Sequence, residues 1–145
     1  MTNFIIHALP AGEADGDARV GRRTPADGPR PCRRCLRNAA VGDQLLLLPY
    51  NPFTLESPYA GEGPIFVHAD GCRPSELGPG EVCEQVTGRV LSVRAYDDDA
   101  MMRTAEVLDG ESLAQRARAL LGEGHAFLHV HFARPGCFAF RVDLA

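Results

Sequence analysis

Residues 126–144, AFLHVHFARPGCFAFRVDL, decide the fold more than any other stretch. Two runs of alternating apolar residues flank Arg134, Pro135 and Gly136, which are typical of a turn. Because successive side chains of a strand point to opposite faces, this pattern predicts an antiparallel hairpin with one apolar face. We expect that face to consist of Leu128, Val130, Phe132, Phe138, Phe140, Val142 and Leu144.

The other face of this hairpin carries the polar side chains. His129 and His131 would lie about 6.6 Å apart on one strand, with Cys137 close by and Arg141 further along. Two imidazoles at that spacing can converge on one ion or phosphate. A half-exposed sheet face without chemistry is the alternative. Cupins have a similar pair of alternating histidines, but the glutamate that follows the pair in cupins is missing here. Histidine-triad hydrolases need a third alternating histidine, and Ala133 stands at that position.

The rest of the sequence predicts further strands and one helix. Apolar runs bounded by Gly, Pro or Asp predict strands at 4–6, 44–50, 65–68, 86–96 and 101–108. Leu113, Ala117, Leu120 and Leu121 follow a helical spacing, which predicts an amphipathic helix near 110–121 with Asp109 as its N-cap. Strands outnumber helices and follow one another in hairpins. We therefore expect an α+β protein with a mainly antiparallel sheet.

Composition limits the domain organisation and the function classes. A chain of 145 residues with 45% hydrophobic residues suits a single domain, within which residues 8–31 have too few large apolar side chains to be other than irregular. A net charge of -4 argues against a nucleic-acid partner. No apolar run is long enough for a membrane span, and no secretion signal is recognisable, so we expect a cytoplasmic protein. All 15 basic side chains are Arg, which indicates a GC-rich bacterial genome.

Four residues have the chemistry of a zinc site. Cys32 and Cys35 form a C-x-x-C pair, and His68 and Cys72 follow about thirty residues later. Three thiolates and one imidazole satisfy tetrahedral zinc. The first pair lacks the glycines that usually allow such a turn, so packed or free thiols are the alternative. A redox-active C-x-x-C is a further alternative, although the βαβ context typical of thioredoxin is absent.

Three classes of function remain open. The first is a metal- or small-ligand-binding module with a structural zinc site. The second is an enzyme that uses His129 or His131 as general acid–base while Arg94 or Arg141 holds an anionic substrate. The third is a protein interaction domain without chemistry. If Arg94 converges with the histidines in one pocket, the enzyme is favoured, whereas dispersal over a flat face favours a partner surface.

Several strings, taken in order, resemble one known family. They include Arg22-Arg23, Pro31-Cys32-Arg33, the run 45–50, Ser57-Pro58-Tyr59-Ala60, Gly63-Pro64-Ile65-Phe66, the run 92–97, His129-Val130-His131, Gly136-Cys137 and Arg141-Val142. The chain is similar over nearly its whole length, from about Arg22, to the bacterial family called domain of unknown function 1203. The resemblance implies no established activity. It implies a functional surface at His129, His131 and Cys137 rather than a zinc site shared by the family.

Overall fold

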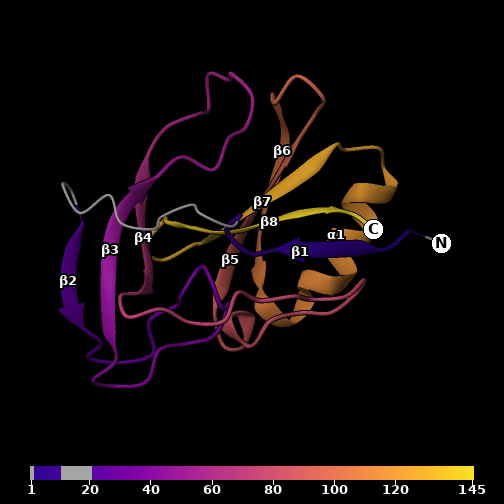
Figure 1. Ribbon diagram of the computed structural model, residues 1–145. Helices are drawn as coiled ribbons and strands as arrows, with labels where there is room; N and C mark the ends of the chain where they lie inside the picture. Colours follow the sequence, from indigo (N-terminus) through magenta and orange to yellow (C-terminus); the bar gives the residue numbers. More distant parts are fainter. Residues whose placement is uncertain (1, 11–20) are drawn as a thin grey trace.

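The structure is a computed structural model that describes residues 2–10 and 21–145. Its described part has two antiparallel sheets and one α-helix, which confirms the α+β class (Figure 1). The elements are β1 (Phe4–His7), β2 (Arg22–Pro25), β3 (Gln44–Tyr50), β4 (Gly63–His68), β5 (Val90–Tyr96), β6 (Met102–Asp109), α1 (Leu113–Gly122), β7 (Phe127–Phe132) and β8 (Phe138–Leu144). Short 3-10 turns lie at Glu84–Val86 and Gly110–Ser112. No helix of this described part is long and apolar enough to cross a membrane.

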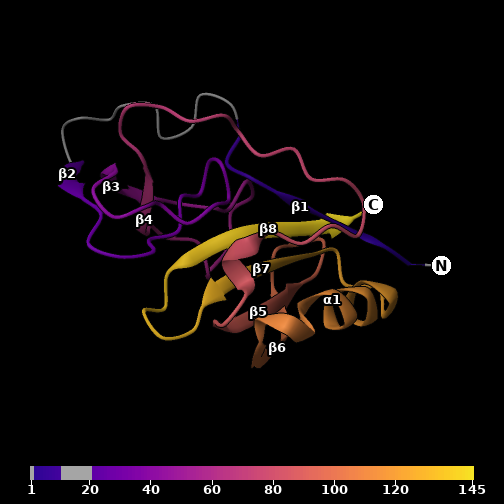
Figure 2. The ribbon, with the colours of Figure 1, turned by 90° about the horizontal axis from the view of Figure 1, so that it is seen from below.

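The larger sheet has the strand order β1-β8-β7-β5-β6, and α1 packs on one of its faces (Figure 2). The predicted helical stripe is confirmed, since Leu113, Ala117 and Leu120 are buried against Leu128 and Val130 of the sheet. The predicted cap is wrong, because Asp109 precedes a 3-10 turn and its side chain makes no capping hydrogen bond. Glycine is required next to it, since a side chain at position 110 would collide with the backbone carbonyl of Val86.

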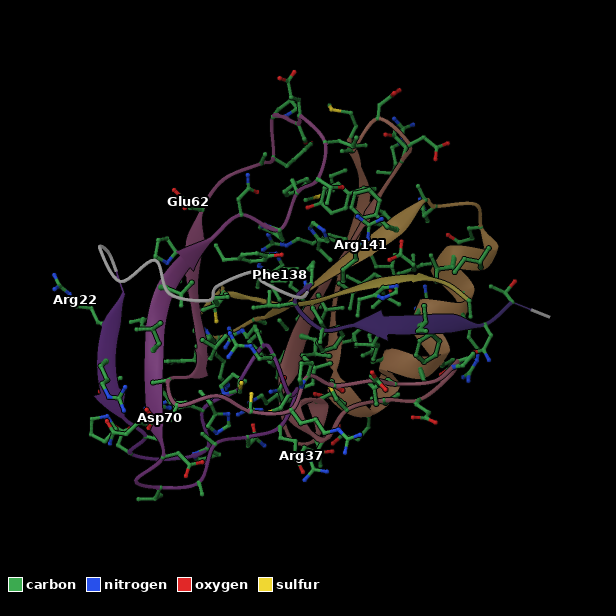
Figure 3. The ribbon with its side chains drawn as sticks, in the orientation of Figure 1. Arg22, Arg37, Glu62, Asp70, Phe138 and Arg141 are labelled. Carbon is green, nitrogen blue, oxygen red and sulfur yellow. The ribbon has the colours of Figure 1, made fainter. Side chains whose placement is uncertain are left out.

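A β-bulge corrects the predicted register of the final hairpin. Val130 pairs with Phe140, but His131 pairs with Phe138, so Ala139 is the extra residue of β8. Phe138 therefore lies on the histidine face and not, as predicted, on the apolar face with Phe140. Its ring packs between the large sheet and the β3–β4 pair, as Figure 3 shows.

The smaller sheet has the order β2-β3-β4, and its buried apolar residues belong to two small clusters. The strand predicted at 44–50 is confirmed as β3, in which Leu45 and Leu48 are buried whereas Leu46 and Leu47 are only partly so. The sheet also begins earlier than predicted, because β2 falls inside the segment 8–31 that we expected to be irregular. Residues 11–20 of that segment lie outside the described residues.

Candidate functional site

The structure brings the four candidate metal ligands together. Cys32 and Cys35 lie in a turn, His68 is the last residue of β4, and Cys72 comes shortly after the Ala69–Asp70 turn. One ligand atom from each of the four lies within 4.8 Å of the others. The group Cys32, Cys35, His68 and Cys72, called the Cys3His cluster below, could therefore hold a metal ion.

The measured separations fit tetrahedral coordination. Zinc with Zn–S bonds of about 2.3 Å and a Zn–N bond of about 2.0 Å needs S···S separations of about 3.8 Å and S···N separations of about 3.5 Å. The sulfurs of Cys32 and Cys72 are 3.7 Å apart, and Cys35 Sγ lies 3.7 Å from His68 Nδ1. Both distances are far too long for a covalent bond and close to those that a shared ion would impose.

A leucine takes the place of the missing turn glycine. The Leu36 N–H donates to the Cys32 carbonyl at 3.0 Å, and Leu36 has a φ of 57°, in the left-handed region that favours glycine. A left-handed residue other than glycine costs about 1–2 kcal/mol. The side chain of Leu36 is fully buried in the core beneath the large sheet, and this burial offsets the cost. The objection from sequence, that the pair lacks glycines, therefore does not apply to this turn.

Asp43 contacts the His68 ring at the nitrogen that does not face the other ligands of the cluster. Its Oδ2 lies 3.1 Å from His68 Nε2, while Nδ1 of the same ring faces Cys35. Burial lowers the pKa of His68, but the Asp43 carboxylate and the Cys32 thiol outweigh burial and leave this pKa raised. A carboxylate on the far nitrogen is the usual outer partner of a metal-bound histidine, because it fixes the ring and its tautomer.

The pKa values of the three thiols are shifted in different directions, with that of Cys32 lowered and those of Cys35 and Cys72 raised. A hydrogen bond from Cys35 is the largest of the effects that lower the pKa of Cys32, and it correspondingly raises the pKa of Cys35. Burial, followed by the charge of Cys32, raises the pKa of Cys72. The backbone N–H of His68 also donates to Cys32 Sγ at 3.4 Å. The cluster is thus prepared to hold anionic sulfur, and a cation would allow the remaining thiols to lose their protons.

Two buried polar residues that the sequence analysis did not single out hold the Cys32 turn in place. Gln85 Nε2 donates to the carbonyls of Cys32 and Arg37, both at 2.9 Å. Arg33 is 1% exposed and donates from Nε to the Phe138 carbonyl at 2.8 Å and from Nη2 to Cys137 Sγ at 3.0 Å. The sequence gives no sign that Arg33 is buried, because its burial depends on the tertiary contact with β8.

The Cys3His cluster borders an open cavity of about 990 Å³. Cys35, His68 and Cys72 line it together with Asp43, whereas Cys32 is buried. Solvent therefore reaches three of the four candidate ligands from one side.

The two histidines of β7 have different surroundings. His129 is not exposed to solvent, and within the described residues neither ring nitrogen has a hydrogen-bond partner. The rings of Phe53, Tyr96, Phe127 and Phe138 surround it at centroid distances of 4.7–5.2 Å. Burial lowers the pKa of His129 to about 3. A substrate does not reach this ring, so the geometry does not favour His129 as a general acid–base.

His131 lies in a cavity of about 310 Å³ with Arg94 and Cys137. Its Nε2 is 3.4 Å from Arg94 Nη1, and its Nδ1 is 3.0 Å from the Gly136 carbonyl. Burial lowers the pKa of His131 to about 4, so the ring is neutral at pH 7. Arg94, His131 and Cys137 are thus brought together as a group.

Arg141 does not join that group. It binds Asp143 through two hydrogen bonds of 2.8 and 2.9 Å, and its guanidinium lies 4.2 Å from the centroid of the Phe127 ring. It lines a different cavity, on the side of His7 and Leu9.

A family model matches most of the chain. The family is described as "Protein of unknown function (DUF1203)", and the match covers residues 29–143. No curated protein and no solved structure matches the chain. The matched range contains the Cys3His cluster and both histidines of β7. Since the match covers most of the 145 residues, the chain belongs to the DUF1203 family.

Proposed function

We propose that this protein binds zinc through Cys32, Cys35, His68 and Cys72, and that the metal has a structural role. The observation that carries the proposal is the convergence of these four ligand atoms within 4.8 Å, from two segments more than thirty residues apart. Three soft thiolates and one imidazole favour zinc over magnesium or calcium, which prefer oxygen ligands. Four protein ligands fill a tetrahedral shell and leave no position for a substrate.

The position of the cluster supports a structural role. Cys32 forms a bridge with Phe66 of β4, and its neighbour Arg33 extends to β8. A metal would therefore fasten the 32–36 turn to the end of β4 and, through Arg33, to the large sheet. The smaller sheet gains most from this, because the buried apolar clusters that include its residues are small.

Elemental analysis of full-length protein purified without added metal or chelator tests the proposal. We expect about one zinc per chain. Cys35→Ser should lose the metal and lower the melting temperature, because metal binding is linked to folding. Cys137→Ser is the matched control, since Cys137 is a half-buried thiol outside the cluster and serine keeps an acceptor for Arg33 Nη2. Absence of zinc from the wild-type protein, or equal loss in both variants, would contradict the proposal.

The outer partner of His68 provides a finer test. Asp43→Asn should lower the affinity for zinc by about 10–100-fold, because it removes the charge that orients the ring. Asp70→Asn removes the same charge from an exposed residue that pairs with Arg23, and it should leave zinc affinity unchanged. A competition titration with a chromophoric chelator measures both affinities. Equal affinities for the two variants would assign Asp43 no role at the metal.

A further inference from the structure

A further cavity, of about 460 Å³, is lined by Arg33, the neighbour of Cys32. Four arginines line it, namely Arg30, Arg33, Arg89 and Arg134, together with the aromatic rings of Phe66 and Phe132. Among the residues that the structure describes, no aspartate, glutamate or histidine lines this arginine pocket. Its volume lies within the range of about 300–1,000 Å³ that is typical of small-molecule sites.

Two of these guanidinium groups are held rigidly by neutral acceptors. Arg33 donates to the Phe138 and Pro31 carbonyls and to Cys137 Sγ. Arg89 donates from Nη1 to Asn38 Oδ1 and to the Gln85 carbonyl, both at 2.7 Å. Both guanidinium carbons lie 5.1 Å from the centroid of the Phe132 ring. Their geometry is fixed in advance, and no carboxylate of the described residues neutralises either charge.

The other two arginines lie at the rim. Arg30 pairs with Asp27 at 2.8 Å, but both side chains are largely exposed, and such pairs contribute only about 0–1 kcal/mol. Arg134 lies in the exposed turn between β7 and β8. Both side chains are therefore available to an incoming anion without loss of a buried contact.

Net charge alone does not explain this concentration of cations. The whole chain carries -4, so long-range attraction of anions is not expected, and four guanidinium groups around one cavity are a local departure. Guanidinium forks match phosphoryl oxygens, and a dianion can engage more of them than a carboxylate can. The rings of Phe66 and Phe132 add an apolar surface beside the charged one.

We propose that the arginine pocket binds a phosphorylated small molecule, with its phosphoryl group on the guanidiniums and its apolar part against the two rings. The site is separate from the Cys3His cluster and holds whether or not the cluster binds zinc. Arg33 contributes to both sites: its guanidinium lines the arginine pocket, and its backbone, next to Cys32, donates an N–H to the Phe66 carbonyl of β4 at 2.9 Å.

Calorimetric titration of the full-length protein, as purified, with phenyl phosphate, inorganic phosphate and benzoate tests the proposal. We expect saturable binding of phenyl phosphate, weaker binding of inorganic phosphate, which lacks the ring, and the weakest binding of benzoate. Arg134→Gln and Arg30→Gln should each weaken phenyl phosphate binding by about three- to tenfold, with an unchanged melting temperature. Arg103→Gln is the matched control, because Arg103 is an exposed arginine of β6 outside the pocket.

Three results would overturn the proposal: no saturable binding of phenyl phosphate, an equal loss in Arg103→Gln, or benzoate binding as tightly as phenyl phosphate. The zinc content of the same samples separates this outcome from that of the metal site. A protein without zinc that binds phenyl phosphate would contradict the proposed function alone, and a zinc-loaded protein that does not bind it would contradict this inference alone.

Discussion

The two sheets are stabilised in different ways. The large sheet and α1 share a cluster of eighteen buried residues, which is enough to form a core without a ligand. The smaller sheet contributes to two smaller clusters, of six and three buried residues. The cluster of six also includes Phe138 of the large sheet. Polar contacts take over there: Gln85 and Arg33 fix the Cys32 turn, and the Cys3His cluster lies at the end of β4. The comparison teaches that the smaller sheet relies more on polar contacts than on an apolar core, and that the proposed zinc would reinforce it.

If the proposed zinc is bound, its removal should separate the two sheets most strongly. After chelation, the amides of β3 and β4 should lose hydrogen-exchange protection by at least about a hundredfold, because the zinc-bound state no longer holds them together. The amides of β5 and β7 should keep theirs, since their pairing is covered by the larger core. Hydrogen exchange followed by mass spectrometry measures both regions in one sample. Equal loss in the two sheets would show that they unfold as one unit and that the comparison is wrong.

A substitution that creates a cavity in the large core should lower stability without changing the zinc content. Leu128→Ala should lower the free energy of unfolding by about 2–5 kcal/mol, since Leu128 is fully buried beneath α1. The zinc content should stay at the wild-type value, because Leu128 does not contact the cluster. Val107→Ala on the exposed side of the same sheet is the control and should change stability by less than about 0.5 kcal/mol. Chemical denaturation and elemental analysis give the two readouts, and a loss of zinc in Leu128→Ala would connect the regions.

The same division explains what could be predicted from sequence. Periodicity identified α1 and the strands of the large sheet, because burial of one face imposes a repeat on the residues that form it. The strand predicted at 86–96 begins only at Val90, because a 3-10 turn occupies Glu84–Val86. The Cys3His cluster was predicted from ligand type and spacing alone. The sheet face on which Phe138 lies was predicted wrongly, since a β-bulge leaves no mark in an alternating sequence. The burial of Arg33 and the left-handed conformation of Leu36 were not predicted, because both depend on contacts with segments far away in the chain.

His129 lies where the two regions meet and offers the mildest test of the comparison. Phe53 from the loop after β3 and Phe138 of the smaller cluster close over its ring, and its nitrogens have no hydrogen-bond partner among the described residues. An unpaired buried imidazole must stay neutral, so burial lowers its pKa to about 3, against about 6.5 in the unfolded chain. Above pH 6.5 neither state binds a proton and this histidine gives stability no pH dependence. Below pH 6.5 only the unfolded state binds one, so stability falls as the pH falls towards 3.

His129→Leu should remove that pH dependence. At pH 8 the variant should be within about 1 kcal/mol of the wild type, because leucine has a similar volume and no unpaired polar atoms. At pH 5 it should be more stable than the wild type by about 2 kcal/mol, which is the cost of keeping one proton off the folded protein 1.5 pH units below the unfolded pKa. Urea denaturation at the two pH values measures the difference, with His7→Gln as the control substitution at a half-exposed histidine. If His129→Leu loses stability equally at both pH values, the ring has a hydrogen-bonding role in the junction and the two regions are joined by more than packing.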